Sequence, residues 1–194
     1  QNEQTYDALS VANSSVDKLK LSYTHISNVN RIFGEDSAVG DMEMDTHLIN
    51  ANYSFAAGSL SGYAYLLESD DNFAGFKRVD TDTYGVRWQG KAGIVAYNLE
   101  YATQKSNGDN PADYTADYML AEANIDIAPV VLGLGYEVLS ADDDGFFITP
   151  LATLFKFQGW IDNFVNRGLG NISEGVKDAY LTVSGAAYGM NWQL

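Results

Sequence analysis

The sequence predicts an all-β fold, an up-and-down antiparallel transmembrane β-barrel, and three observations lead to this prediction. Apolar and polar residues alternate in twos along most of the chain, which is the period of a strand with two unlike faces. Several alternating runs are about 9–13 residues long, which suits a tilted membrane crossing better than the ~5–6 residues of a typical soluble strand. Short and long connections also follow one another in strict alternation, as they do in an outer-membrane barrel.

The alternation places the strands in order along the chain. One well-marked example has Val95, Tyr97, Leu99 and Tyr101 on one face and small or polar residues on the other. About ten strands are expected on this basis, as part of a larger barrel. They are placed at residues 3–12, 17–28, 45–56, 59–69, 81–90, 93–104, 114–127, 130–140 and 177–186, with a last strand that begins near 190.

The connections between these strands fall into two classes. Long connections suit the loops at the outer end of a barrel, and short ones suit its periplasmic turns. The short connections are Asn13–Val16, Ala56–Ser59, Gly90–Gly93, Ala128–Pro129 and Ala187–Met190. The long connections are Asn28–Glu43, Ser69–Asp80, Lys105–Asp113 and Ala141–Val176. We therefore expect one β-barrel domain over residues 1–194, in which 141–176 is a long extracellular loop.

This longest loop carries a segment with a different period, TPLATLFKFQGWIDNF at Thr149–Phe164. Its large apolar residues recur every three or four positions, which predicts one or two short helices. Pro150 suits the first helical turn, and Gly159 allows a bend. Because an apolar helical face needs cover, the segment is expected to fold inward or across the mouth, as a constriction or as a packed lid. Its apolar residues are Leu151, Leu154, Phe157, Trp160, Ile161 and Phe164.

Composition excludes several classes of function. The net charge of -15 argues against nucleic acid as a partner, because phosphates require a basic surface. The chain has no cysteine, so disulfides and thiolate metal sites are excluded. No apolar run approaches the ~18 residues of a membrane helix. Motifs of nucleophilic, zinc-dependent or phosphate-binding enzymes are absent, so neither catalysis nor a cofactor is expected.

Charged residues on the face opposite the apolar one are expected to line the lumen of the barrel. They either pair across strands and keep the interior wet or form a ring that sets ion preference, and both roles can hold together. Lys18 and Lys20 lie near a short turn and are expected at the periplasmic rim. The expected pore-lining residues are Lys18, Lys20, Arg87, Glu100, Glu122, Asp126 and Glu137.

Two other groups of polar residues, the acidic clusters of the loops and the two histidines, are not expected to bind a ligand. The long loops carry acidic clusters such as Asp142, Asp143 and Asp144, but their spacing does not match that of a calcium loop. These clusters are expected to be solvated. The two histidines, His25 and His47, are expected as residues of the membrane interface, and no metal site is expected.

A resemblance to known proteins lies in six segments, Gln1–Leu9, Ser27–Asp41, Leu48–Asp71, Asp82–Trp88, Leu99–Tyr118 and Gly135–Phe164. These segments resemble porin-like outer-membrane proteins of the alginate-export type in Gram-negative bacteria. The likeness runs along essentially the whole chain, and the TPLATL segment is its most specific part. It implies a longer barrel, with strands before Gln1 and after Leu194. The short final strand indicates the same, since a few residues cannot cross an apolar band of about 25 Å.

The expected function is a passive channel in the cell outer membrane for small hydrophilic solutes or sugar-acid-like molecules. Its expected partners are outer-membrane lipid, lipopolysaccharide and the solute. The acidic excess predicts a modest cation preference. Two alternatives remain open from the sequence: a narrow or closed barrel with a structural or adhesive role in its outer loops, and a soluble β-barrel that binds a ligand.

Overall fold

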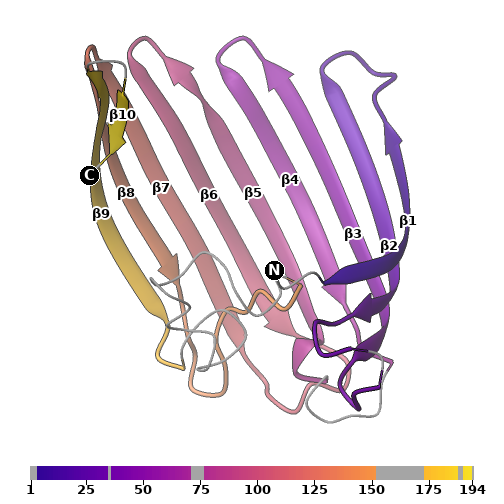
Figure 1. The fold of residues 1–194 in the computed structure, drawn as a ribbon. Coiled ribbons are helices and arrows are strands. Elements are labelled where there is room, and N and C mark those ends of the chain that lie inside the picture. Colours follow the sequence, from indigo (N-terminus) through magenta and orange to yellow (C-terminus); the bar gives the residue numbers. More distant parts are fainter. Residues whose placement is uncertain (1–3, 35, 71–76, 152–172, 188–189, 194) are drawn as a thin grey trace.

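The computed structural model describes residues 4–34, 36–70, 77–151, 173–187 and 190–193. They form one antiparallel sheet of ten strands in up-and-down order, so that each strand pairs with its sequence neighbours (Figure 1). The strands are β1 Thr5–Asn13, β2 Leu19–Asn30, β3 Asp41–Phe55, β4 Gly58–Leu67, β5 Thr81–Ala92, β6 Val95–Ser106, β7 Thr115–Ile127, β8 Val130–Leu139, β9 Val176–Ala187 and β10 Met190–Gln193. A single-turn 3₁₀ helix, η1, covers Lys77–Val79.

The predicted all-β ladder is confirmed, and its strand bounds differ from expectation by a few residues at most. The largest difference is at β3, which begins at Asp41 instead of 45. It is longer because Val29 pairs with Met42 and both side chains are buried. Short and long connections lie at opposite ends of the sheet, as the alternation predicts (Figure 1).

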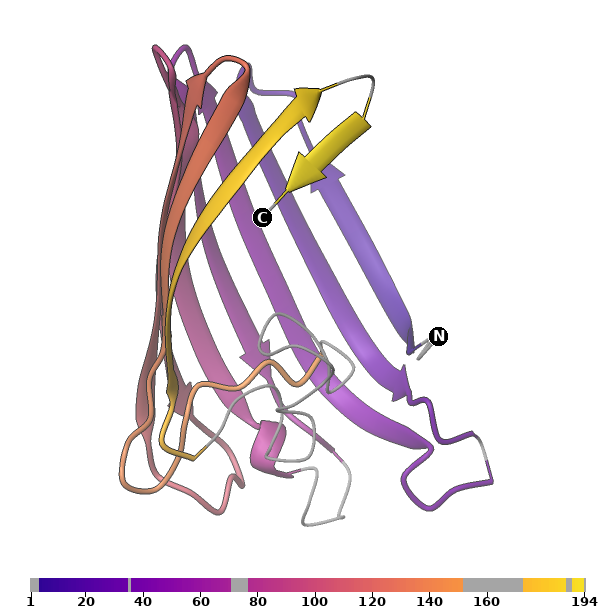
Figure 2. The same ribbon diagram turned by 60° about the vertical axis from the view of Figure 1, so that its left-hand side comes forward.

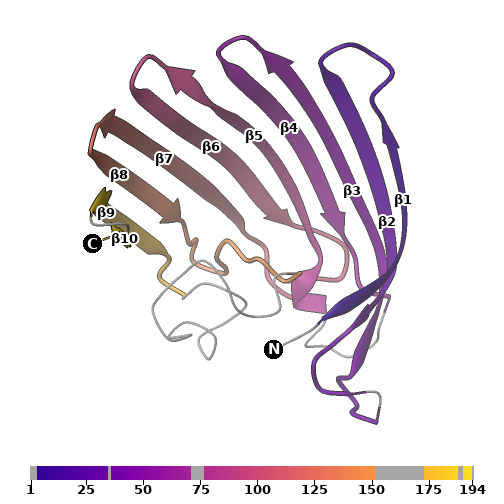
Figure 3. The same cartoon turned by 45° about the horizontal axis from the view of Figure 1, so that its top comes forward.

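The sheet is strongly curved and open. In the described part of the chain, β1 and β10 are its two edges and do not pair with each other (Figures 1 and 3). Residues 140–151, which follow β8, run along the concave side of the sheet near the end with the long loops (Figure 2). The sheet therefore has a convex face, a concave face and a partly covered end.

Two clusters of buried residues lie at the end with the long loops. The first cluster contains Ile26, Val29, Met42, Met44, Leu67 and Val79. The second contains Ala102, Tyr114, Ala116, Leu139 and Phe147. Elsewhere along the strands, large apolar side chains are exposed on the convex face, including Leu134 at 53% and Leu181 at 63%. Within the described ranges, no helix has both the length and the apolar character needed to span a membrane.

Strand register places each side chain on one of the two faces. Gln104 and Tyr118 contact the segment after β8, so their side chains face the concave side. The residues next to them in sequence, such as Thr103 and Met119, then lie on the convex face. Their register partners lie on the same face: Tyr84 is paired with Thr103, and Tyr101 is paired with Met119. Because the side-chain period of a strand is two, the register fixes the face of every other residue in the ladder.

Candidate functional site

The concave face carries a connected band of polar side chains, which we call the polar wall. It crosses the middle of the sheet from β4 to β9. Its members are Tyr63, Arg87, Asn98, Glu100, Tyr118, Glu122, Glu137 and Tyr180. Four of them, Arg87, Glu100, Glu122 and Glu137, are among the residues expected to line a lumen, and the register brings them together on one face.

Arg87 links the centre of the polar wall. Its Nε donates to Oδ1 of Asn98 at 2.7 Å and lies 3.6 Å from Oε2 of Glu100, the residue directly opposite on β6. Asn98 in turn donates from Nδ2 to Oε2 of Glu122 at 2.7 Å. The guanidinium thus contacts two residues of β6, and its charge stabilises the carboxylate of Glu100 as an ion pair. Asn98 extends the contact to Glu122 on β7.

Two tyrosines also donate hydrogen bonds to the carboxylates of Glu100 and Glu122, and both do so with the same geometry. Tyr63 on β4 donates to Oε1 of Glu100 at 2.7 Å, and Tyr180 on β9 donates to Oε1 of Glu122 at 2.6 Å. Each ring reaches a glutamate two strands away and crosses the strand between them.

The strand that each ring crosses has a glycine at the crossing point. A Cβ at Gly85 would lie 2.1 Å from Cζ of Tyr63, and a Cβ at Gly135 would lie 2.0 Å from Cζ of Tyr180. Only glycine leaves room for a ring to lie flat on the sheet at these positions. The two glycines therefore allow the polar wall to form, because any other residue would displace a tyrosine from its glutamate.

The remaining expected pore-lining residues are less closely connected. Glu137 accepts a hydrogen bond from Tyr118 at 2.7 Å. Lys20 and Asp126 lie on the concave face by register, nearer the short turns, and are exposed. Lys18 lies in the turn before β2 with a φ of 63°, and its Nζ is 3.9 Å from the carboxylate of Asp17, with both side chains largely exposed.

The segment after β8, residues 141–151, is held against the concave face by side-chain contacts; we call it the crossing segment. Gln104 on β6 holds it at Ile148: its amide nitrogen donates to the Ile148 carbonyl at 3.0 Å, and its amide oxygen accepts from the Ile148 N–H at 2.8 Å. The ring of Phe147 lies 5.6 Å from that of Tyr118. The segment therefore covers the polar wall at the end with the long loops.

The far end of the crossing segment reaches the other side of the sheet. The hydroxyl of Tyr6 on β1 donates to the carbonyl of Leu151 at 2.5 Å, and Leu151 packs against the first buried cluster. Leu151 is thus the one residue of the expected lid whose position is described. Leu154, Phe157, Trp160, Ile161 and Phe164 lie outside the described residues, as does most of the expected helical segment.

Buried polar groups fasten the neighbouring loops at the same end. Asp80, between η1 and β5, is fully buried, and its Oδ1 accepts from the Ser69 N–H at 2.7 Å. Burial raises the pKa of this carboxyl above its ordinary value. Tyr114, before β7, is buried in the second cluster, and burial raises its pKa to about 12. Both groups are buried among the loops that they hold in place, which fits a structural role.

Sequence reasoning did not identify the tyrosines, Asn98 or Gln104 as members of the site. Period-two alternation shows which face a residue occupies, but the partners depend on register. Given the short turns, the register could have shown that Tyr63 and Glu100 occupy one face two strands apart. It could also have shown that His25 and His47, expected only as interface residues, are directly opposite each other.

Comparison of the chain with protein-family models, with curated proteins and with solved structures finds no match.

Proposed function

We propose that this sheet forms part of a transmembrane β-barrel of the outer membrane, which acts as a passive channel for small hydrophilic solutes or sugar-acid-like molecules. One observation carries the proposal: the two faces of the sheet have opposite character along its full width. Large apolar side chains stay exposed on the convex face, whereas charged and amide side chains bond to one another on the concave face. A soluble sheet buries its apolar face, and a membrane barrel turns it toward lipid.

Strand length supports the same proposal. The strands from β2 to β9 are 10 to 15 residues long. A tilted membrane strand needs about 9–11 residues. Because an unpaired edge is not tolerated in lipid, the proposed barrel includes further strands that pair with β1 and β10. The resemblance to porin-like proteins of the alginate-export type agrees with a larger barrel.

The charge on the polar wall favours cations. It carries three glutamates against one arginine. Nearer the short turns on the same face, Asp126 and Lys20 offset each other in charge. An acidic wall concentrates cations near it and disfavours anions. We therefore propose a modest cation preference. The crossing segment narrows the path at the end with the long loops.

Ion flow through single channels tests this function. The purified protein in a planar bilayer should give stepwise conductance, and its reversal potential in a KCl gradient should show preference for K⁺. Glu122→Gln keeps the shape of the side chain and removes one charge from the wall, so it should reduce that preference. Asp117→Asn is the matched control, because Asp117 lies on β7 with Glu122 but faces the convex side by register.

A second candidate function is a narrow or closed barrel with a structural or adhesive role. The crossing segment favours it, because Gln104 and Tyr6 fix that segment across the concave face. The same bilayer experiment separates the two. Insertion without conductance steps would support the closed barrel and reject the channel, and clear anion preference would reject the proposed role of the acidic wall.

A further inference from the structure

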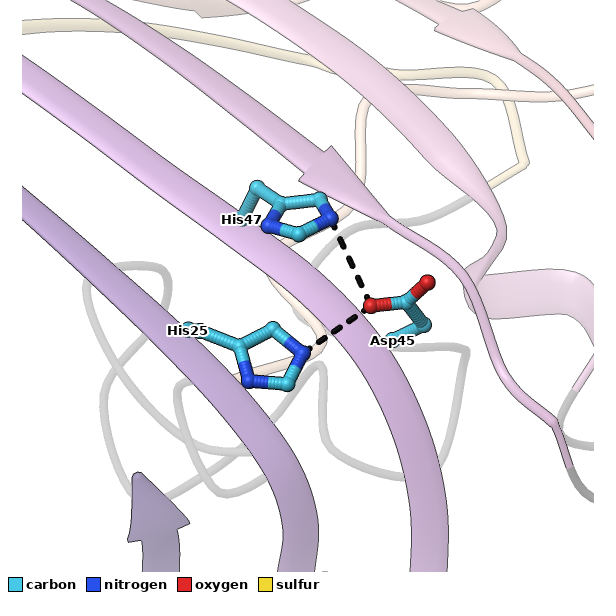
Figure 4. Close-up of side chains that lie close together, drawn as sticks. All are labelled: His25, Asp45 and His47. Atoms are coloured by element: carbon cyan, nitrogen blue, oxygen red, sulfur yellow. Dashed lines mark hydrogen bonds and ion pairs between the residues drawn. The ribbon is translucent and has the colours of Figure 1, made fainter. Parts of the chain in front are cut away.

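Three ligand-type side chains meet on the convex face, away from the polar wall. His25 on β2 and His47 on β3 are directly opposite in the register, and Asp45 lies two residues before His47 on the same face. The imidazole rings are 5.2 Å apart between centroids. In Figure 4 both rings point toward the carboxylate of Asp45. The chain contains only two histidines, and the fold brings them together.

The geometry of the three groups matches that of ligands around one ion. Nε2 of His25 lies 2.9 Å and Nε2 of His47 lies 3.4 Å from the same Oδ1 of Asp45. One ligand atom from each residue falls within 4.8 Å of the others. Metal–ligand distances of about 2.0–2.1 Å place neighbouring ligand atoms about 2.9–3.4 Å apart. Small side-chain rotations would therefore bring all three atoms onto one ion.

A neighbouring residue orients one of these ligands. The hydroxyl of Tyr23 is 2.8 Å from Nδ1 of His47, and the two rings are stacked. A hydroxyl can accept as well as donate, so Tyr23 can accept from Nδ1–H when Nε2 of His47 binds a metal. An outer contact of this kind fixes the tautomer and ring orientation of a metal-binding histidine. Tyr23 is thus a positioning residue for His47.

The surroundings of the cluster favour a cation. His25 and Asp45 border a shallow hollow of about 520 Å³ at the end of the sheet with the long loops. Asp41, Glu43 and Asp70 also line this hollow, and no lysine or arginine is among its described lining residues. The negative field attracts a cation, and the space leaves room for water to complete its coordination.

From these observations we propose that His25, Asp45 and His47 bind one divalent transition-metal ion of the Zn²⁺ class. Two imidazoles and one carboxylate suit Zn²⁺, Co²⁺, Ni²⁺ or Cu²⁺, whereas Ca²⁺ and Mg²⁺ prefer all-oxygen sites. The site lies on the face opposite the polar wall. It is therefore independent of solute passage and goes beyond the proposed channel function.

The wild-type protein provides the first test. After treatment with EDTA and removal of the chelator, Zn²⁺ should bind saturably at one ion per chain in isothermal titration calorimetry. Co²⁺ should give visible absorption bands that Zn²⁺ abolishes. Diethyl pyrocarbonate should modify His25 and His47, as located by peptide mass spectrometry, and Zn²⁺ should protect both residues. These measurements need no mutation, so they remain informative if a variant misfolds.

Variants then assign the ligands. His47→Gln removes a ligand and should weaken Zn²⁺ binding by more than about 100-fold, whereas Tyr23→Phe removes only the outer contact and should weaken it about 10–100-fold. The Tyr23→Phe variant should unfold at the same temperature as wild type without metal, which separates positioning from a general structural role. Asp41→Asn is the matched control: it removes a charge from the hollow but no ligand, so the stoichiometry should stay at one.

Three results would overturn the proposal. One is the absence of saturable Zn²⁺ binding up to roughly 1 mM, the weakest affinity that would count as a site. Another is binding that His47→Gln and His25→Gln leave unchanged. The third is equal binding of Ca²⁺ with no protection of the histidines, which would identify the acidic hollow alone as the source of affinity.

Discussion

Replacing Gly135 with alanine should show whether the glycine beneath Tyr180 maintains the polar wall. The added Cβ would lie 2.0 Å from Cζ of the tyrosine, whereas two carbon atoms in contact are about 3.5–4.0 Å apart. The ring must therefore move by about 1.5 Å or more, and its hydroxyl leaves Glu122. The wall loses a hydrogen bond to a charged group, and the ring is displaced into the space above the sheet.

The expected cost follows from two opposing terms. A hydrogen bond to a charged group contributes about 1.5–3 kcal/mol. Replacing glycine with alanine lowers the conformational entropy of the unfolded chain, which stabilises the folded state by about 0.4–1 kcal/mol. The free energy of unfolding should fall by about 1–2 kcal/mol, a change of roughly 5–30-fold in the ratio of folded to unfolded protein. Gly85→Ala, beneath Tyr63, should behave in the same way.

Urea unfolding of the protein in lipid vesicles, followed by tryptophan fluorescence, measures this cost. Gly62→Ala is the matched control, because a Cβ at this position has no atom within 4 Å and should stabilise the protein slightly. In a Tyr180→Phe background the hydrogen bond is already lost, so Gly135→Ala should cost much less there. Equal effects of Gly135→Ala and Gly62→Ala, or the same cost in both backgrounds, would refute this account.

Three other predictions concern the convex face, the crossing segment and a buried acid. Leu134→Arg on the proposed lipid face should lower the free energy of unfolding in vesicles by about 2–4 kcal/mol, and no loss there would contradict lipid exposure. Gln104→Ala releases Ile148 and should raise single-channel conductance if the crossing segment narrows the path; unchanged conductance would mean that the segment only packs. Because burial raises the pKa of Asp80, ionisation of Asp80 opposes folding. The stability that the protonated carboxyl contributes is therefore fully present below the ordinary aspartate pKa, and it is lost as pH rises through the pKa of Asp80 in the folded protein. Asp80→Asn can still accept from Ser69, so in urea titrations its stability relative to wild type should increase with pH over that window, and a constant difference would contradict the assignment.

Much of the fold could be predicted because alternation, strand length and turn spacing all act locally. The strands from β4 to β8 match expectation closely, since their two faces are unlike in character and short turns join β5 to β6 and β7 to β8. The ends of β2 and β3 were harder to predict, because their pairing beyond Ile26 depends on the burial of Val29 and Met42 together.

The contacts of the site were less predictable. Charge and period placed Glu100 on the polar face, but its bond to Tyr63 depends on Gly85 of β5, the strand that lies between the two residues. The hydrogen bonds of Gln104 to the backbone of Ile148 join residues 44 positions apart, and Ile148 lies in a loop without periodic structure. Nothing local indicates such a contact, because an amide side chain can satisfy a backbone group wherever the chain returns.

The contact between Tyr6 and Leu151 has a consequence for the order of folding. Every strand pairs with its sequence neighbour, so the ladder can grow hairpin by hairpin without closing a large loop. The Tyr6 contact, by contrast, joins residues 145 positions apart and spans the arc of the sheet from the β8 side to β1. This contact can form only after the strands have curved. Once formed, it restrains the curvature and resists flattening of the sheet.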